Sequence, residues 1–413
     1  MNILWSQVAS DRCAVRQTQP RSASIAPAAL LIGVGFMSST LVTPLYALYR
    51  AKFHFSEITL TLIYAVYVVG NLVALLFCGR LSDRIGRVRA GVPALILALC
   101  STVLYVFATG TAWLFVARLV SGFAVGLSSG TGTAWLADLY GESRQSRATA
   151  AAASANLAGA AAGPLLAGLL AQYAPAPLQL SFFVYAVMLV VTAFVVAHAC
   201  ESVERPAIGL KDVSFAPRIG VPPGTRGKFI PPAIAGFSSF ALAGFYFALL
   251  PGVLSRDLGN TSIATAGAVV FEMIAIAALV TLFLRGLKSE KAMLSGLLML
   301  VPSVVILVLA QALKSMPLLL VGSAVTGAAL GLGYRGSLEV VIELAPQDKR
   351  AAVVSAYFCA IFVGNSIPII GIGVLSVLTS PLVANTVFAS TIGAFATSAV
   401  AIGLRYFKIG KKQ

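Results

Sequence analysis

Charged side chains are scarce in this sequence. Of its 413 residues only 10% are Asp, Glu, Lys or Arg, whereas about a quarter of a soluble globular domain is charged. Histidine occurs twice and cysteine five times, and the cysteines lack the paired spacings of a metal site or a disulfide framework. The composition therefore excludes an ordinary soluble domain and gives no reason to expect a bound metal. The cysteines are Cys13, Cys78, Cys100, Cys200 and Cys359.

Nucleotide-binding motifs are also missing. Gly331, Gly333 and Gly336 match the letters of a dinucleotide-binding fingerprint, but they stand inside an apolar run. That fingerprint requires a strand before it. The sequence also contains no phosphate-binding loop that ends in Lys-Ser or Lys-Thr. We therefore expect no nucleotide cofactor and no direct use of ATP.

Long apolar runs are what the sequence has in abundance. Hydrophobic residues make up 59% of the chain, and the mean hydropathy is +0.93. A helix of about 20 apolar residues crosses a hydrocarbon core of roughly 30 Å, whereas barrel strands alternate apolar and polar residues. The sequence predicts an all-α polytopic membrane protein with twelve transmembrane helices. The predicted spans are 26–48, 58–78, 90–110, 112–136, 148–172, 178–199, 231–253, 262–284, 292–313, 316–340, 351–375 and 382–404.

The basic residues indicate how the chain is oriented. The net charge is +15, and most of the 29 Lys and Arg fall in segments that share one side of the membrane if the N-terminus is cytosolic. This distribution follows the positive-inside rule. The basic charge therefore reports topology, and we expect no nucleic-acid partner. We predict a multi-pass protein of the cell (inner) membrane with both termini in the cytosol.

Proline marks an internal duplication. Every odd-numbered span contains a proline that pairs with one in the other half at a separation of about half the chain length: Pro44 with Pro251, Pro93 with Pro302, and Pro164 with Pro368. In spans 4 and 10, Gly126 corresponds to Gly331 and Asp138 to Glu343. The duplication predicts two pseudo-symmetric six-helix bundles. The expected divisions are a cytosolic tail at 1–25, bundles at 26–199 and 231–404, a cytosolic linker at 200–230 and a cytosolic tail at 405–413.

A duplicated bundle with matched prolines suits a secondary transporter. Two similar halves can rock about a site at their interface, and interrupted helices are tolerated where they line a cavity. The alternative outside transport is a membrane sensor or receptor. No loop is large enough to form a sizeable ligand-binding or catalytic domain, so we favour transport.

The loop between spans 2 and 3 holds four arginines and one aspartate in the thirteen residues "GRLSDRIGRVRAG". The stretch matches Gly-x-x-x-Asp-(Arg/Lys)-x-Gly-(Arg/Lys)-(Arg/Lys) except at the last position, Val88. The matching residues are Gly79, Asp83, Arg84, Gly86 and Arg87. This pattern resembles the signature of the major facilitator superfamily, and the spans, halves and linker resemble that family along nearly the whole chain. The resemblance implies that family's fold and a transporter, not an enzyme.

The resemblance also implies a gating role for the motif. In transporters of this kind the aspartate, here Asp83, docks on the N-terminus of span 11 and holds the halves together while the site faces outward. A helix N-terminus attracts negative charge, and span 11 begins at the same face as the motif. The arginines can also pair with Asp138 at the end of span 4. The alternative is that Arg84, Arg87 and Arg89 only set topology.

Two further segments resemble motifs of the family. Arg118 in span 4 is followed at intervals of four by Gly122, Gly126 and Gly130, which predicts one small-residue face for close packing. This segment is similar to the motif whose arginine lies in the membrane of proton-coupled members. A structural role for Arg118, bonded to backbone carbonyls, is the alternative.

Span 5 contains Gly163, Pro164 and Gly168 in a pattern similar to one typical of antiporters, with Ala167 in place of a second glycine. The resemblance implies export. Physically, the segment predicts a helix that can bend and pack closely against its counterpart, span 11. We therefore expect Gly163, Pro164 and Gly168 to act as a pivot.

Proton coupling requires an ionisable group in the membrane. Of the fourteen acids, Glu272 alone falls near the middle of a span, and Glu339 lies in span 10 four residues after Arg335. A membrane-embedded carboxylate is by default a functional hypothesis. Glu272 and Glu339, with Arg118, are therefore our candidates for coupling. The alternatives are a hydrogen-bonded structural glutamic acid, or a charge that binds a cationic substrate.

Aromatic side chains are candidates for the lining of a substrate cavity. We single out Tyr46, Tyr64, Tyr67 and Tyr246, although membrane helices also use such residues for packing. Arg335 is a further candidate, because an arginine can contact the carboxylate of a substrate.

The sequence thus predicts a secondary active transporter similar to the twelve-span drug:proton antiporters. It would export a small organic compound, drug-like or a metabolite, by alternating access, with the proton gradient as energy source and no cofactor. Its expected partners are the small-molecule substrate, protons and the lipid bilayer, and we expect a monomer. The alternative is a proton symporter or facilitator that imports an organic anion, with Arg118 or Arg335 at the carboxylate.

Overall fold

The computed structural model describes residues 21–79, 81–203 and 219–409, and every regular element within these ranges is a helix. Twelve segments among them are long and apolar enough to cross a membrane, which confirms the predicted all-α fold. The first half contains α2 (Arg21–Thr40), η1 (Thr43–Leu45), α3 (Tyr46–Phe53), α4 (Glu57–Cys78), α5 (Leu81–Ile85), α6 (Arg87–Val106), α7 (Thr111–Tyr140), η2 (Glu142–Arg144), α8 (Gln145–Tyr173) and α9 (Leu180–Ala197). The second half contains η4 (Pro223–Thr225), α10 (Arg226–Ala248), α11 (Leu250–Arg256), α12 (Ile263–Phe283), α13 (Ser289–Ala312), α14 (Met316–Leu344), η5 (Gln347–Lys349), α15 (Arg350–Gly364), α16 (Ile367–Leu378) and α17 (Pro381–Ile409).

Several helices extend past the predicted spans into the predicted polar segments. α2 begins at Arg21, α10 begins at Arg226 and α17 continues to Ile409. Hydropathy finds only the apolar part of a helix, whereas the backbone hydrogen bonds continue into the polar flanks. The rest of the predicted tails 1–25 and 405–413, residues 204–218 of the predicted linker 200–230, and Cys13 lie outside the described residues.

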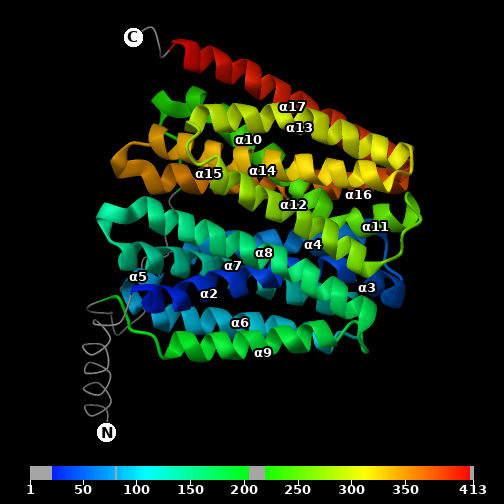
Figure 1. The fold of residues 1–413 in the computed structure, drawn as a ribbon, viewed down its shortest axis with the longest axis horizontal. Coiled ribbons are helices and arrows are strands. Elements are labelled where there is room, and N and C mark those ends of the chain that lie inside the picture. The colour runs from blue at the N-terminus through cyan, green and yellow to red at the C-terminus, as the bar shows by residue number, and fades with distance from the viewer. Residues whose placement is uncertain (1–20, 80, 204–218, 410–413) are drawn as a thin grey trace.

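The two halves are built in the same way. In the first half, α4 and α6 pack on α7, α6 packs on α9, and α2 packs on α8. In the second half, the corresponding α12 and α13 pack on α14, α13 packs on α17, and α10 packs on α15. The duplication inferred from proline spacing therefore describes two pseudo-symmetric bundles, which lie one above the other in Figure 1.

The prolines divide into two structural groups. Pro44, Pro251 and Pro368 stand at interruptions that split spans 1, 7 and 11 into two helical pieces each. The other three lie inside the continuous helices α6, α8 and α13. Proline lacks an N–H donor and weakens a helix wherever it stands, so the surrounding packing decides which helices break. Span 5 is continuous at Pro164, whereas its counterpart, span 11, is interrupted at Pro368.

The halves meet through two pairs of spans. α8 packs against α12, and α16 packs against α4. The prediction that span 5 packs against its counterpart span 11 is therefore wrong. The apparent twofold relation between the halves places span 5 opposite span 8 and span 2 opposite span 11, so these spans do not pack on their own counterparts, whereas counterpart spans 1 and 7 touch through α3 and α11.

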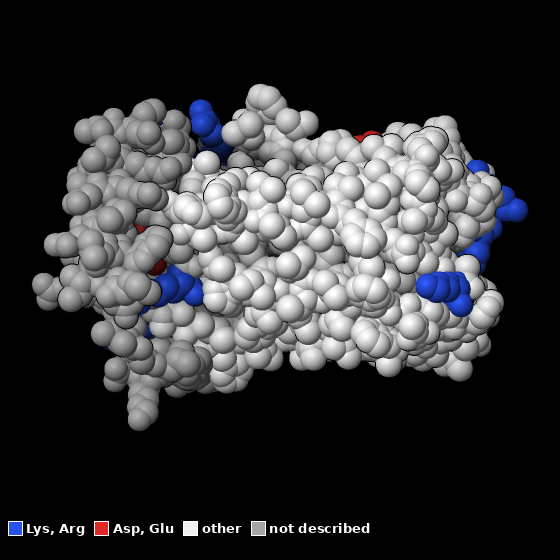
Figure 2. Space-filling view, turned by 90° about the horizontal axis from the view of Figure 1, so that it is seen from below, with Lys and Arg blue, Asp and Glu red and all other residues white. Residues whose placement is uncertain are grey.

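The molecule has two distinct ends. We call the end that carries Asp138 and Glu201 the linker end, and the end that carries His54 and Arg256 the opposite end. In Figure 1, α5 lies at the linker end on the left, and α3 and α11 lie at the opposite end on the right. Figure 2 shows blue Lys and Arg groups near both ends and a broad face without charged side chains between them. With the twelve apolar segments, this makes the chain an integral multi-pass membrane protein.

Candidate functional site

A fully buried arginine occupies the middle of the first half. The side chain of Arg118, on α7, has 0% exposure. Its Nε donates to the hydroxyl of Tyr46 at 2.7 Å, and its Nη1 donates to the carbonyl of Ser39 at 2.7 Å. The guanidinium carbon lies 5.3, 5.7 and 5.5 Å from the ring centroids of Tyr46, Tyr64 and Tyr67. The structure thus brings three of the predicted cavity tyrosines together around Arg118.

This cage stabilises the positive charge without a counter-ion among the described residues. The aromatic faces and the Ser39 carbonyl provide electron-rich partners, and no Asp or Glu forms an ion pair with Arg118 in the described part of the chain. A buried charge without an ionic partner is costly and attracts an anion. The structural alternative for Arg118 is a bond to backbone carbonyls. In the structure Arg118 makes such a bond to Ser39 and also lies within the tyrosine cage.

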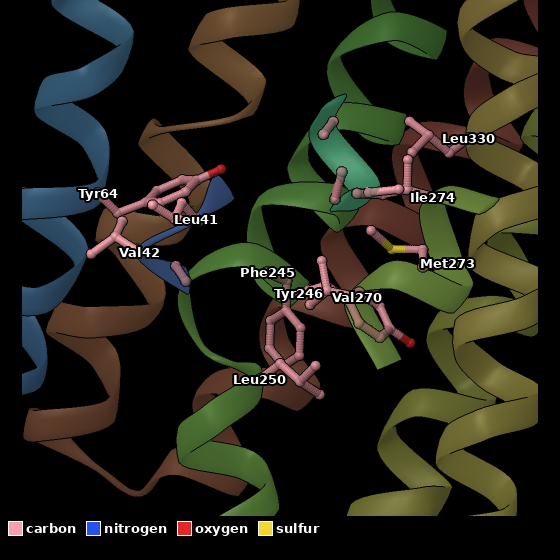
Figure 3. Close-up of a cluster of buried hydrophobic side chains, with 14 of the residues drawn as sticks. Leu41, Val42, Tyr64, Phe245, Tyr246, Leu250, Val270, Met273, Ile274 and Leu330 are labelled. Carbon is pink, nitrogen blue, oxygen red and sulfur yellow. The ribbon is translucent and has the colours of Figure 1, made fainter. Parts of the chain in front are cut away.

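One cage tyrosine joins the two halves. The hydroxyl of Tyr64 donates to Oδ1 of Asn365 at 2.9 Å, across 301 positions of sequence. Asn365 stands in the interruption between α15 and α16. Figure 3 shows Tyr64 with Leu41 and Val42 on one side of the buried cluster and residues of α10 on the other. Asn365 was not identified from the sequence as a site residue, because nothing local signals its partner.

The acid predicted at mid-membrane lies in the second half. Glu272, on α12, is partly buried, and its Oε2 accepts a hydrogen bond of 2.7 Å from Ser323 on α14. Ser323 lies on the helix that corresponds to α7, seven residues after its first residue, Met316. Arg118 likewise lies seven residues after Thr111, the first residue of α7, so the two residues occupy matching places. No Lys or Arg forms an ion pair with Glu272 among the described residues. Its carboxyl is therefore held by a neutral donor.

Tyr246 lies in the second half, apart from the tyrosine cage. It is fully buried, and its hydroxyl accepts a bond of 3.4 Å from Thr326, which in turn pairs with Ser303 at 2.5 Å. In Figure 3 the hydroxyl of Tyr246 points away from Tyr64. The candidate residues therefore form two clusters, one in each half.

Arg335 and Glu339 lie nearer the linker end. Nε of Arg335 donates to Oε1 of Glu339 at 2.9 Å, and its other nitrogens donate to the carbonyls of Leu284, Arg285 and Leu287. A cation at the C-terminus of α12 satisfies its free carbonyls and the helix dipole. Arg335 thus caps α12, and the Glu339 carboxylate, with 38% of its side chain exposed, is already paired.

The charged motif at the linker end forms a network centred on Arg87. Its Nη1 donates to Oδ1 of Asp83 at 2.5 Å and to Oγ of Ser82 at 2.7 Å, and its Nε donates to Oδ2 of Asp138 at 2.8 Å. The expected partnership with Asp138 is therefore present. Asp83 remains within its own half, with 49% of its side chain exposed, and Arg84 is exposed.

Glu201 completes this network. Its Oε1 and Oε2 accept hydrogen bonds from the backbone nitrogens of Arg87 at 2.6 Å and Val88 at 3.0 Å, at the start of α6. An acid at this position stabilises the unpaired N–H groups and the dipole of the helix. Gly86 adopts φ 106°, and a Cβ there would lie 2.4 Å from Glu201 Oε2, so this position requires glycine. Glu201 was not predicted, since it follows span 6, far from the motif in sequence.

The small residues of spans 4 and 5 produce close helix contacts. A Cβ on Gly122 would lie 2.0 Å from the Tyr67 carbonyl oxygen, and one on Gly126 would lie 2.6 Å from Ala74 Cβ. A Cβ on Gly130 would meet nothing within 4 Å. Close helix packing therefore involves Gly122 and Gly126 but not Gly130. The second half repeats these contacts with Gly327 and Gly331 against α12.

The predicted pivot residues contact both halves. A Cβ on Gly163 would lie 2.5 Å from Oγ1 of Thr40, where α2 ends. Gly168 lies against α12 of the second half, and a Cβ on Gly267 would lie only 2.2 Å from the carbonyl oxygen of Pro164. Gly163, Pro164 and Gly168 therefore lie where α8 packs between α2 and α12.

An ion-pair cluster at the opposite end joins the halves. Glu57, in the first turn of α4, pairs with Arg256 at the end of α11, and Nη1 of Arg50 lies 3.8 Å from the same carboxylate oxygen. Burial raises the pKa of the neighbouring Asp257. The positive charge of Arg256 opposes this increase, and the negative charge of Glu57 adds to it. The cluster was missed from the sequence, because Glu57 and Arg256 are 199 positions apart.

No group of three or more His, Cys, Asp or Glu side chains converges as a metal site within the described ranges. The polar groups that do converge are the Arg118 cage, the Glu272–Ser323 pair and the two end clusters. Such an arrangement can bind charged groups inside the membrane and can hold the halves together at one end.

Comparisons with known proteins agree with this architecture. The sequence matches the model of the Major Facilitator Superfamily over residues 28–368, and a comparison with curated proteins finds no match. Among solved structures, the chain is similar to a crystal structure of a bacterial homolog of the human lysosomal transporter Spinster, in an inward-facing and unoccupied conformation. The TM-score is 0.66 at 16% identity, covering 94% of this chain and 95% of that one. At this identity the likeness shows the fold alone.

Proposed function

The chain belongs to the Major Facilitator Superfamily, and from this premise we propose that it is a secondary active transporter that exports a small organic compound in exchange for protons. Members of such folds alternate access to a site between their two bundles. The proposed energy source is the proton gradient, without a cofactor, and the proposed working unit is the monomer.

The single observation that carries the coupling proposal is the environment of Glu272. Its carboxyl lies in α12, within an apolar span, and is bonded to the neutral hydroxyl of Ser323. A carboxylate without a cationic partner gains a proton more readily than a paired one. Glu339 already has Arg335 as partner, so we propose Glu272 as the proton carrier and Glu339 as part of the α12 cap.

We assign the linker end to the cytosol of the cell (inner) membrane, because most Lys and Arg of the sequence fall in segments on that side. The opposite end then faces outward, where the Glu57–Arg256 pair and the α8–α12 contact hold the halves together. The geometry corresponds best to a conformation closed toward the outside. We propose that in the alternate conformation Asp83 leaves Arg87 and docks on the N-terminus of α15, as the family resemblance implies.

A second candidate is the import of an organic anion by proton symport or by facilitation. The observation that favours it is Arg118, which is buried without an acidic partner among the described residues. An anionic substrate would neutralise that charge at the centre of the first half. Arg335 is unsuited to this role because it caps α12.

Proteoliposomes with an internal pH dye separate these candidates. A panel of small organic cations, anions and neutral compounds is added against an imposed proton gradient. Export by antiport predicts that substrate and protons move in opposite directions, and symport predicts movement together. If no compound of the panel causes proton movement, coupling is refuted.

The matched variants Glu272→Gln and Glu339→Gln test the carrier. We expect Glu272→Gln to abolish uphill transport while exchange down a substrate gradient continues, because a neutral side chain cannot carry the proton. Glu339→Gln should keep uphill transport. Loss of coupling in Glu339→Gln alone would assign the proton to that residue instead.

A further inference from the structure

A cavity of about 540 Å³ lies between the two halves at the opposite end. Its wall in the first half includes Arg50, His54 and Leu60, and its wall in the second half includes Pro251 and Arg256. This volume is within the range of pockets that hold small organic molecules. We call it the outer vestibule.

Positive charge exceeds negative charge at this vestibule. Both lining arginines form ion pairs with one carboxylate, that of Glu57, while Asp257, which also interacts with Arg256, does not line the vestibule. The Glu57 side chain is only 8% exposed, whereas those of Arg50 and Arg256 are 37% and 31% exposed. The guanidinium donors that Glu57 does not use therefore remain accessible from the vestibule, while the acid is shielded.

The same arginine holds the halves together. Arg256 belongs to the second half and Glu57 to the first, and their charge-assisted hydrogen bond crosses the interface. A Cβ on Gly252 would lie 3.6 Å from Nη2 of Arg256. Since Gly252 also lines the vestibule, no side chain at this position screens the guanidinium.

The floor of the vestibule leads toward the buried arginine. Tyr46 lines the vestibule, and its hydroxyl accepts the 2.7 Å bond from Nε of Arg118. Tyr46 therefore links the lining of the vestibule to the charge at the centre of the first half. The positive groups form a series from the opposite end into the membrane.

We propose that the outer vestibule is a binding site for a small organic carboxylate, whose occupancy releases Glu57 from Arg256 and unlocks the opposite end. Glu57 bonds to Arg256 through one carboxylate oxygen only, whereas a ligand carboxylate that reaches the exposed guanidinium can form two parallel bonds to it. The ligand and Glu57 thus compete for Arg256, and the cross-half ion pair is lost when the ligand wins.

The lining selects the chemical class of the ligand. Apolar side chains of Phe55, Leu60, Ala248 and Pro251 accompany the arginines, so an apolar body with one negative end is complementary to the site. Inorganic phosphate satisfies only the charge, and a neutral aromatic alcohol satisfies only the apolar wall. The site does not depend on the direction of transport proposed above.

Binding is tested on the full chain in lipid nanodiscs with benzoate as probe and benzyl alcohol and inorganic phosphate as matched controls. We expect benzoate to raise the melting temperature in a saturable manner and the controls to raise it much less. Arg256→Gln and Arg50→Gln should each weaken benzoate binding by about tenfold or more, because each removes a charged donor. Lys52→Gln, which removes a charge from the same helix outside the vestibule, should leave binding unchanged.

Unlocking is tested by the rate at which a maleimide labels a cysteine placed at Thr61, after the native cysteines are replaced. Thr61 is fully buried against Gly373 of the second half, so it becomes accessible when the halves separate at that end. Benzoate should accelerate the labelling several-fold, and Glu57→Gln should accelerate it without benzoate. Arg50→Gln keeps the Glu57–Arg256 pair and should leave the rate without benzoate low.

Three results would overturn the proposal. Equal stabilisation by benzoate and benzyl alcohol would show an apolar pocket, and equal stabilisation by phosphate would show a simple anion site. Unchanged benzoate binding in both Arg256→Gln and Arg50→Gln would show that benzoate does not bind at the vestibule arginines. Because Arg50→Gln leaves the cross-half pair intact, it tests binding even if Arg256→Gln fails to fold.

Discussion

Replacing Gly267 by alanine is expected to destabilise the conformation in which the opposite end is closed. The added Cβ would lie 2.2 Å from the carbonyl oxygen of Pro164 and 3.2 Å from Cα of Gly168. Carbon–oxygen contacts between close backbones are ordinarily about 3.3–3.6 Å. α12 and α8 must therefore separate by roughly 1 Å to accept the methyl group.

The size of the effect follows from the cost of overpacking, which is typically about 1–3 kcal/mol. This cost applies only while α8 and α12 are in contact, so it falls on one conformation of the alternating pair. A bias of that size changes a population ratio by about 5–150-fold. The helix-propensity gain of a Gly-to-Ala change, by contrast, is the same in both conformations.

Distances between spin labels measure this shift. With the native cysteines replaced, labels at Tyr173 and Thr261 report the separation of the halves at the opposite end, where both side chains are exposed. We expect the longer-distance population to grow in Gly267→Ala. The matched control is Gly130→Ala, whose Cβ meets nothing within 4 Å. An unchanged distance distribution, or an equal change in both variants, would refute the argument.

Three further predictions concern stability and coupling between the halves. Arg87→Gln should lower the free energy of unfolding by about 1–2 kcal/mol, a value reduced for the exposure of its acidic partners. Thermal melting in detergent measures this, with exposed Arg89→Gln as control, and equal melting temperatures would contradict it. Tyr64→Phe removes the bond to Asn365 and should weaken the contact between the halves by about 0.5–1.5 kcal/mol. The distances between the labels at Tyr173 and Thr261 should shift as a result. If they do not shift, the bond does not help to hold the halves together. The pKa of Asp257 is raised by burial, so its folded-state pKa exceeds the unfolded value of about 3.9, and the protein loses stability as the pH rises through the interval between them. Asp257→Asn should therefore gain in melting temperature over wild type across that interval and keep a constant gain above it, whereas a gain independent of pH would contradict the assigned cause.

Local features of the chain were predictable from composition and spacing. The twelve spans follow from apolar runs, because hydropathy is a property of each segment by itself. The duplication follows from matched prolines, since both halves repeat the same packing of helices. The charged motif is likewise local, and its Asp83–Arg87 pair joins positions only four apart, on either side of the break at Gly86.

The candidate site depended on contacts that no local pattern encodes. Arg118 was recognised as a membrane-embedded charge, but its cage of tyrosines comes from two other helices, α3 and α4. Gly130 belongs to the same spaced series as Gly122, yet it packs against nothing within 4 Å. Spacing along a helix fixes which residues share a face, and only the neighbouring helix determines which part of that face is covered.

The sequence by itself determined the membrane-spanning class, the number of spans, the two related halves and the charged motif between spans 2 and 3. The tertiary structure alone decided that span 5 meets span 8, that Tyr64 bonds to Asn365, and that Glu57 pairs with Arg256. The physical reason is the same in each case. Hydropathy, charge and helical spacing act over a few residues, whereas contacts between the halves depend on how two complete bundles rotate and dock against each other.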